Sequence, residues 1–155
     1  MIKKWAVVTI GCLLMGLANA QNVLSQPVDD LRFGQEIITG DRLKQGMDAS
    51  GFMFVYCIES TWYKLGVMFP EMSRDDKVAG VLDICQPRIE EYQVYNILMA
   101  ADYIGEPKSE QQAWHIYQKN RQDGANEVDL DLQDKIKVYL ATLNDQAPED
   151  FLFIY

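Results

Sequence analysis

Two cysteines placed symmetrically about a predicted turn constrain the fold of this chain more than any other feature. The segments around Cys57 and Cys85 both carry apolar residues at helical spacing. The residue midway between the two cysteines is Glu71, inside the stretch "FPEMS", where Pro70 ends the first helical pattern. Two helices joined by a tight turn bring together residues that are equidistant from that turn. The register therefore predicts a helical hairpin clipped by a Cys57–Cys85 disulfide.

Matching apolar faces on the two arms support this hairpin. The apolar side chains of the first arm recur at spacings of four, four and three residues: Phe54, Ile58, Trp62 and Leu65. Those of the second arm recur at spacings of three, one and three residues: Val78, Val81, Leu82 and Cys85. Ser73, with Asp76 at the third helical position, predicts the N-terminal cap of the second arm. Pro87 predicts a kink or a restart of that helix near Gln86, because its ring clashes with the carbonyl group four residues back.

Helical spacing also dominates the C-terminal half of the chain. It continues from Ile89 to Met99, and after the interruption "GEPKSE" we expect Ser109 to cap the segment "EQQAWHIYQKNR". Asp131, with Asp134 three residues later, is expected to cap a last helix. The apolar stripe of that helix comprises Leu132, Ile136, Tyr139, Leu140 and Leu143. The apolar ending "FLFIY" is expected to dock on the core or on a partner.

The expected fold class is all-α. Residues 21–47 are expected to form a lead-in with a short helix in "VDDLRFGQEII", and helical spacing begins near Asp48. No alternating apolar and polar run predicts a sheet. We therefore expect a compact bundle of about four to six helices that contains the disulfide-clipped hairpin.

The first twenty residues have the three-part pattern of a secretory signal peptide. Lys3 and Lys4 precede an apolar run, which ends in an Ala-x-Ala arrangement at Ala20. We expect cleavage after Ala20, which leaves a single helical domain of residues 21–155 in the periplasm or outside the cell. A retained membrane anchor is disfavoured because the run is short for a bilayer span, and a lipoprotein because Thr9 stands where a branched aliphatic residue is needed. An oxidising compartment favours the disulfide over two free thiols.

The charge of the chain narrows the classes of partner. Without the expected leader, 12 basic and 23 acidic residues remain, which gives a formal charge of −11. Nucleic acid and anionic membrane surfaces would repel such a protein. A cationic protein partner fits this charge, and the oligomeric state stays open, a homodimer included.

The sequence predicts no catalytic residue. Cys57 would need a histidine to become a nucleophile, and a thiol tied to Cys85 cannot attack a substrate. "TWYK" approximates a Ser-x-x-Lys pattern, but it has Thr61 in place of serine and lacks the motifs that accompany this pattern. Glu90 and Glu91 are adjacent, so on a helix they point about 100° apart and do not face each other across a substrate.

No metal or cofactor is predicted either. His115 is the single histidine, and we expect it on the polar or half-buried side of its helix. The acids of "NEVDLDLQD" could hold calcium, but the segment lacks the central glycine and the final glutamate of an EF-hand. Helix capping and a solvated loop explain these acids as well. The aromatic residues at helical spacing are expected in the core, with sugar stacking or an interface as the alternative.

The leader, together with "YCIESTWYKLGV" and "VLDICQP", resembles the small helical periplasmic immunity proteins that act against type VI secretion effectors. The resemblance implies a non-catalytic protein that occludes the active site of a peptidoglycan-degrading enzyme. Enzymes that act on the anionic cell wall are often cationic, and an acidic domain would be steered toward them. We therefore expect the partner at the acidic turn from Asp123 to Asp134. The expected partner-binding residues are Asp123, Glu127, Asp129 and Asp131.

An envelope-stress or chaperone-like periplasmic protein is the alternative function. Exposed apolar surface from "FLFIY" and the methionine-bearing helix faces would serve it. A concave acidic surface would favour the inhibitor, and a deep apolar groove would favour the chaperone or a lipid-like ligand. A pocket with two close carboxylates would favour an enzyme.

Overall fold

Four helices make up the described part of the protein. The computed structural model describes residues 32–123 and 127–153, and of residues 127–130 it describes the backbone alone. The helices are α2 (Gly40–Met68), α3 (Arg74–Tyr103), α4 (Glu110–Gln122) and α5 (Glu127–Thr142). An isolated bridge between Ile37 and Ser109 is the one β-type pairing in these residues. The all-α prediction is confirmed, at the lower end of the expected number of helices. The predicted signal peptide, residues 1–20, lies outside the described residues.

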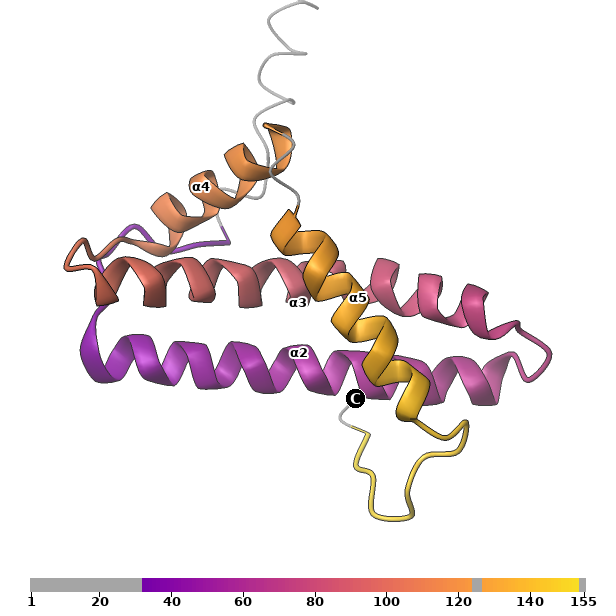
Figure 1. The fold of residues 1–155 in the computed structure, drawn as a ribbon. Coiled ribbons are helices and arrows are strands. Elements are labelled where there is room, and N and C mark those ends of the chain that lie inside the picture. The colour runs from indigo at the N-terminus through magenta and orange to yellow at the C-terminus, as the bar shows by residue number, and fades with distance from the viewer. Residues whose placement is uncertain (1–31, 124–126, 154–155) are drawn as a thin grey trace, which may run out of the picture. The chain divides into compact units, whose positions relative to one another are not determined.

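Helices α2 and α3 form the predicted antiparallel hairpin (Figure 1). The disulfide joins Cys57 to Cys85 across the two arms, with a Cα–Cα distance of 5.9 Å. In the turn, the hydroxyl oxygen of Ser73 accepts a hydrogen bond of 3.2 Å from the backbone N–H of Asp76. The predicted disulfide and the predicted N-cap are therefore both confirmed.

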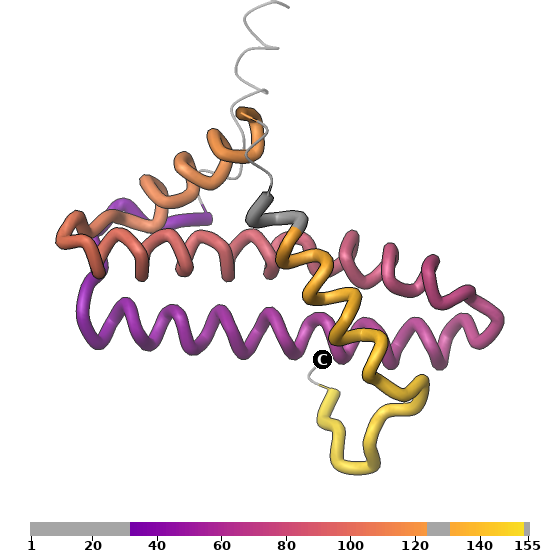
Figure 2. The backbone as a smooth tube through the Cα atoms, viewed as in Figure 1, coloured from indigo at the N-terminus to yellow at the C-terminus, as the bar shows by residue number. Residues whose placement is uncertain are grey.

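Helix α3 continues through Pro87 and does not restart. Figure 2 shows that the axis of α3 bends part-way along the helix, as expected for an internal proline. Pro87 and Asp83, whose carbonyl group loses its helical partner, are both exposed. Water can therefore hydrate the freed carbonyl group, so the proline bends the helix without ending it.

The segment before α2 differs from the expectation. Helix α2 begins at Gly40, well before Asp48, and the described part of the predicted short helix is not helical. Extended backbone there pairs with the start of α4: the N–H of Gln111 donates to the carbonyl of Gly34 at 3.0 Å. The N–H of Ile38 donates to the carbonyl of Lys108 at 3.3 Å. These long-range hydrogen bonds replace the local bonds of a helix.

The main core lies where α5 crosses the half of the hairpin near its turn (Figures 1 and 2). Its buried residues come from α2, α3 and α5: Ile58, Trp62, Tyr63, Leu65, Val81, Cys85, Ile89, Ile136 and Leu140. Phe151 packs edge-on against Tyr63, with ring centroids 4.9 Å apart, and Phe153 packs on Phe151 at 5.0 Å. The expected docking of the C-terminal segment on the core is confirmed for these two residues.

Helix α4 begins with the predicted cap. Ser109 and Gln112 form a capping box: the side chain of each accepts a hydrogen bond from the backbone N–H of the other. Trp114 and Tyr117 are buried on one face, and His115 is exposed, as expected for the polar face. No helix in residues 32–123 or 127–153 is both long enough and apolar enough to cross a membrane.

Candidate functional site

The predicted acidic turn is mostly helix. Asp123 follows α4 and is exposed, but Glu127 and Asp129 belong to the first turns of α5, and their side chains lie outside the description. Asp131 lies inside α5 and pairs with Lys135 at 2.6 Å. The prediction that Asp131 caps this helix is therefore wrong, because α5 begins at Glu127. Acids in the first turn of a helix complement its dipole, which explains why the helix starts earlier.

Acids already pair with most of the basic side chains in the described part of the protein. The ion pairs are Arg42–Glu36, Lys77–Asp145, Arg88–Glu91, Lys108–Glu106, Arg121–Glu90, Lys135–Asp131 and Lys137–Asp134. The chain carries a formal charge of −9, so many acids have no basic counterpart. The surface therefore carries a net negative charge, although Lys44, Lys64 and Lys119 are exposed as well.

Two cations near the turn lie over the ring of the buried Trp62. Lys77 is only 5% exposed; its Nζ lies 2.7 Å from Oδ1 of Asp145 and 4.2 Å from the centroid of the Trp62 ring. The guanidinium of Arg74 donates to the carbonyl of Leu140 at 2.8 Å and lies 5.2 Å from the same ring. The hydrogen bond from Lys77 lowers the pKa of the Asp145 carboxyl group. Both cations thus hold the end of α5 and the segment after it on the hairpin.

The hairpin tip, which we define as residues 67–76, exposes three consecutive large apolar side chains. Val67 is 77% exposed, Met68 65% and Phe69 48%. They lie beside a shallow open hollow of about 510 Å³ that is lined by Met68, Phe69, Pro70, Glu71, Met72 and Asp76. Three acids of the tip, Glu71, Asp75 and Asp76, are exposed as well, against one exposed cation, Arg74. The tip therefore combines an apolar patch with an acidic surround.

An apolar groove lies between α2 and α5. Its volume is about 300 Å³, and its lining is Phe54, Val55, Ile58, Leu132, Lys135, Ile136 and Tyr139. The hydroxyl of Tyr139 donates to Glu59 across the two helices. Burial and this hydrogen bond raise the pKa of Tyr139 to about 12. Such a groove can take an apolar side chain or a small apolar ligand.

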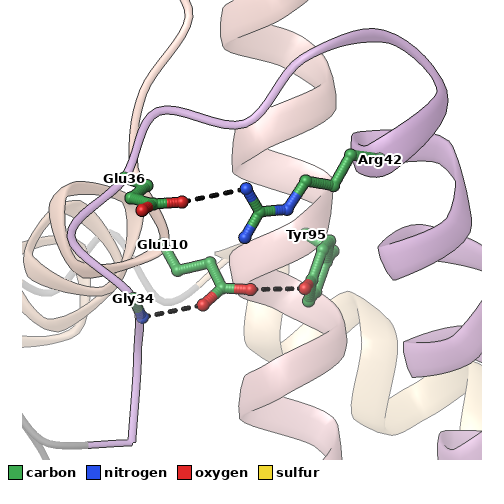
Figure 3. A network of polar contacts seen from close by, with 5 residues as sticks. All are labelled: Gly34, Glu36, Arg42, Tyr95 and Glu110. Atoms are coloured by element: carbon green, nitrogen blue, oxygen red, sulfur yellow. Dashed lines mark hydrogen bonds and ion pairs between the residues drawn. The ribbon is translucent and has the colours of Figure 1, made fainter.

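A polar network joins three segments at the other end of the hairpin (Figure 3). The hydroxyl of Tyr95 donates to Oε1 of Glu110 at 2.5 Å, and the N–H of Gly34 donates to Oε2 at 2.8 Å. Arg42 pairs with Glu36 at 2.9 Å beside them. Burial, followed by the hydrogen bond to Glu110, raises the pKa of Tyr95.

The carboxylates of Glu36 and Glu110 line one hollow of about 420 Å³. A pocket with two close carboxylates is the arrangement that would favour an enzyme. Both oxygens of Glu110 already accept hydrogen bonds, and Glu36 is held by Arg42 at the surface. The contacts therefore fit a structural tie between the lead-in, α3 and α4.

The other predicted chemistry can also be placed. Cys57 is bonded to Cys85, so it has no thiol for a nucleophilic role. Thr61 is buried against the disulfide, with its Oγ1 3.5 Å from Sγ of Cys85, whereas Lys64 is exposed. Within the described residues, no three His, Cys, Asp or Glu side chains are grouped so that they could hold a metal ion.

The hairpin tip was missed at the level of sequence. The signal was the apolar run "VMF" immediately before Pro70, where the core-facing pattern of the first arm ends. No protein-family model, curated protein or solved structure matches this chain. The resemblance to immunity proteins therefore stays a prediction.

Proposed function

We propose that this protein is an exported, non-catalytic protein-binding protein that inhibits a cationic enzyme of the cell envelope. The enzyme class that fits best is a peptidoglycan hydrolase, and the role is that of an immunity protein. The observation that carries the proposal is the acidic excess on the exposed surface. The chain carries a formal charge of −9, so its net charge attracts a basic partner.

Two further features support this proposal. A net negative charge steers a basic partner and speeds its association more than it raises the final affinity. The disulfide between α2 and α3 restrains the hairpin, so little conformational freedom is lost on binding. A restrained acidic domain is suited to occlude a cleft that evolved to hold the anionic cell wall.

A partner capture followed by an inhibition assay tests the proposal. The tagged protein, residues 21–155, is incubated with an envelope extract of the organism that produces it, at low and at moderate salt. We expect a basic cell-wall hydrolase to be retained at low salt and partly released at moderate salt. The purified hydrolase should then lose its ability to clear a peptidoglycan suspension when the protein is added. An unrelated helical protein of equal charge is the control, and equal retention by both would contradict the proposal.

The apolar groove between α2 and α5 favours a second candidate, a chaperone-like protein that binds apolar segments of unfolded chains. Val55 lines this groove and is 44% exposed, so Val55→Asp should abolish protection of an aggregating client without unfolding the protein. Val138 on α5 is 68% exposed but does not line the groove, which makes Val138→Asp the matched control. If both variants protect the client as well as the wild type does, the groove has no such role.

A further inference from the structure

We infer that the hairpin tip, residues 67–76, is the element that enters the partner, and that it fits a cleft with an apolar floor and a basic rim. The inference rests on the proposed function in one respect, since it assumes a cationic protein partner. It adds the place of contact and the chemistry of the surface that receives it.

Three apolar side chains of the tip do not belong to the core, unlike Met72, which packs against it. Val67, Met68 and Phe69 are consecutive, and each leaves about half or more of its surface exposed. Isolated exposed apolar residues are ordinary, but a contiguous group on a turn marks an interaction site. Aromatic and methionine side chains are also those that interfaces favour at their centres.

The charge of the tip selects the kind of partner. Lys77 is buried, and Arg74, although exposed, is held by the carbonyl of Leu140 and lies over the Trp62 ring. The acids Glu71 and Asp75 remain exposed around the apolar group. A positive rim around an apolar floor is the complementary surface, because each exposed acid then meets a cation as it loses water.

The tip is also held in place. The N–H of Phe69 donates to the carbonyl of Leu65 at 2.9 Å, and that of Met72 donates to the carbonyl of Phe69 at 3.0 Å. Ser73 caps α3 directly after the turn. Figures 1 and 2 show the turn at the end of the hairpin, beyond the crossing point of α5. A pre-ordered turn that stands clear of the other helices can enter a cleft without rearrangement.

Two other occupants fit the charge less well. A second copy of the chain would bring the same acids against Glu71 and Asp75, which costs free energy through repulsion. An anionic membrane would accept the apolar side chains but repel the same acids. Asp131 and Asp134 of α5 compete poorly as a docking site, because they pair with lysines of their own helix.

Site-specific photo-crosslinking in the full mature chain tests the inference. The probe is p-benzoylphenylalanine in place of Phe69, and the matched control carries it in place of the exposed His115 on α4. Both proteins are irradiated in an envelope extract of the producing organism, and adducts are identified by mass spectrometry. We expect an adduct at position 69 with a basic protein, none at position 115, and a several-fold lower yield when NaCl rises from about 50 to about 300 mM.

The affinities of two double charge-reversal variants for the identified partner show whether the tip contacts the partner or only lies near it. Glu71→Lys with Asp75→Lys should weaken binding at least tenfold. Asp48→Lys with Asp102→Lys changes the net charge equally at exposed positions outside the tip, and it should weaken binding much less. Melting curves of both double variants establish that they are folded.

Each outcome decides between the two proposals. A cationic partner in the capture experiment without an adduct at position 69 would overturn the role of the tip and leave the proposed function standing. An adduct with a basic protein that is not a cell-wall enzyme would support the tip and overturn the inhibitor role. An adduct the size of two copies of the chain, or flotation of the protein with vesicles of phosphatidylglycerol and phosphatidylethanolamine, would overturn the inference. Failure to capture any cationic protein would overturn both.

Discussion

Both halves of the α2–α3 hairpin bury apolar side chains, but they differ in the further ties that hold them. Near the turn, the disulfide and the contacts of Lys77 and Arg74 with Trp62 fasten α2, α3 and α5 in addition to the apolar cluster. At the other end, the hydrogen bonds of Glu110 fasten α3, α4 and the lead-in. The covalent link, which only the half near the turn has, does not depend on salt or protonation, whereas the polar ties depend on geometry and protonation.

This difference bears on function. The half that carries the exposed hairpin tip is the one with the covalent brace, so the proposed docking element stands on the firmer end. The half without a disulfide carries a hollow lined by polar groups that already have partners. We therefore expect perturbations near the turn to cost more than perturbations at the other end.

The largest effect should come from Trp62→Ala. The indole is completely buried; its N–H donates to the carbonyl of Asn144 at 3.0 Å, and Lys77 and Arg74 lie over the ring. Its loss leaves a large cavity and releases the segment after α5, so we expect the free energy of unfolding to fall by about 4 kcal/mol in urea titrations. Phe52→Ala is the control, because Phe52 is 61% exposed. A similar loss for both variants would mean that the core does not lie near the turn.

Loss of the disulfide should have the second-largest effect on stability. It closes a loop with a sequence separation of 28, and in the chain-entropy model it restricts the unfolded chain by about 3 to 4 kcal/mol. Cys57→Ser and Cys85→Ser should each lower the melting temperature by many degrees. Wild type with a reductant should match them. Equal melting curves for the oxidised wild type and either variant would mean that the disulfide does not stabilise the half near the turn.

A smaller effect, from the other half, is expected for Gly46→Ala. A Cβ atom at Gly46 would lie 2.2 Å from Cε1 of Tyr95, so the ring must move and strain its hydrogen bond to Glu110. Overpacking of this kind costs about 1 to 3 kcal/mol, partly offset by the better helix propensity of alanine. Gly51→Ala is matched, since its Cβ would lie at an ordinary 3.8 Å from Tyr92. Thermal unfolding should show a loss for the first variant and no loss, or a small gain, for the second.

The same two halves differ in how well the sequence predicted them. The hairpin near the turn followed from residue counts: the cysteines are equidistant from Glu71, and the apolar faces repeat at helical spacing. Both signals are local or symmetric, so no knowledge of distant contacts was needed. The start of α2 was missed because Gly40 and Gly46 lower helix propensity. Gly46 leaves room for the ring of Tyr95, a residue remote in the sequence, and no local pattern shows this contact.

The candidate site was harder to predict for a related reason. The stretch "VMF" before Pro70 has the composition of a buried helix end, and only the geometry of the turn shows that its side chains are exposed. Conversely, the Asp131–Asp134 spacing fits a helix cap and a helix interior equally well, and the ion pair with Lys135 belongs to the interior. Sequence patterns indicate which residue types share a face, but not which faces stay uncovered.

The smallest effect expected is a pH dependence near the turn. The hydrogen bond from Lys77 holds the pKa of Asp145 below its ordinary value of 3.8, so the unfolded state binds the proton more readily than the folded state. The pair therefore stabilises the fold above about pH 4, and this contribution is lost as the pH falls through the lowered value. Asp145 lies at the surface, so the contribution is small. Asp145→Asn should melt slightly below the wild type at pH 6, and the difference should vanish toward pH 2 to 3. Asp150→Asn, which leaves the contact with Lys77 intact, should show no such convergence. A difference that stays constant down to the lowest pH would mean that Asp145 stabilises the fold through something other than its charge.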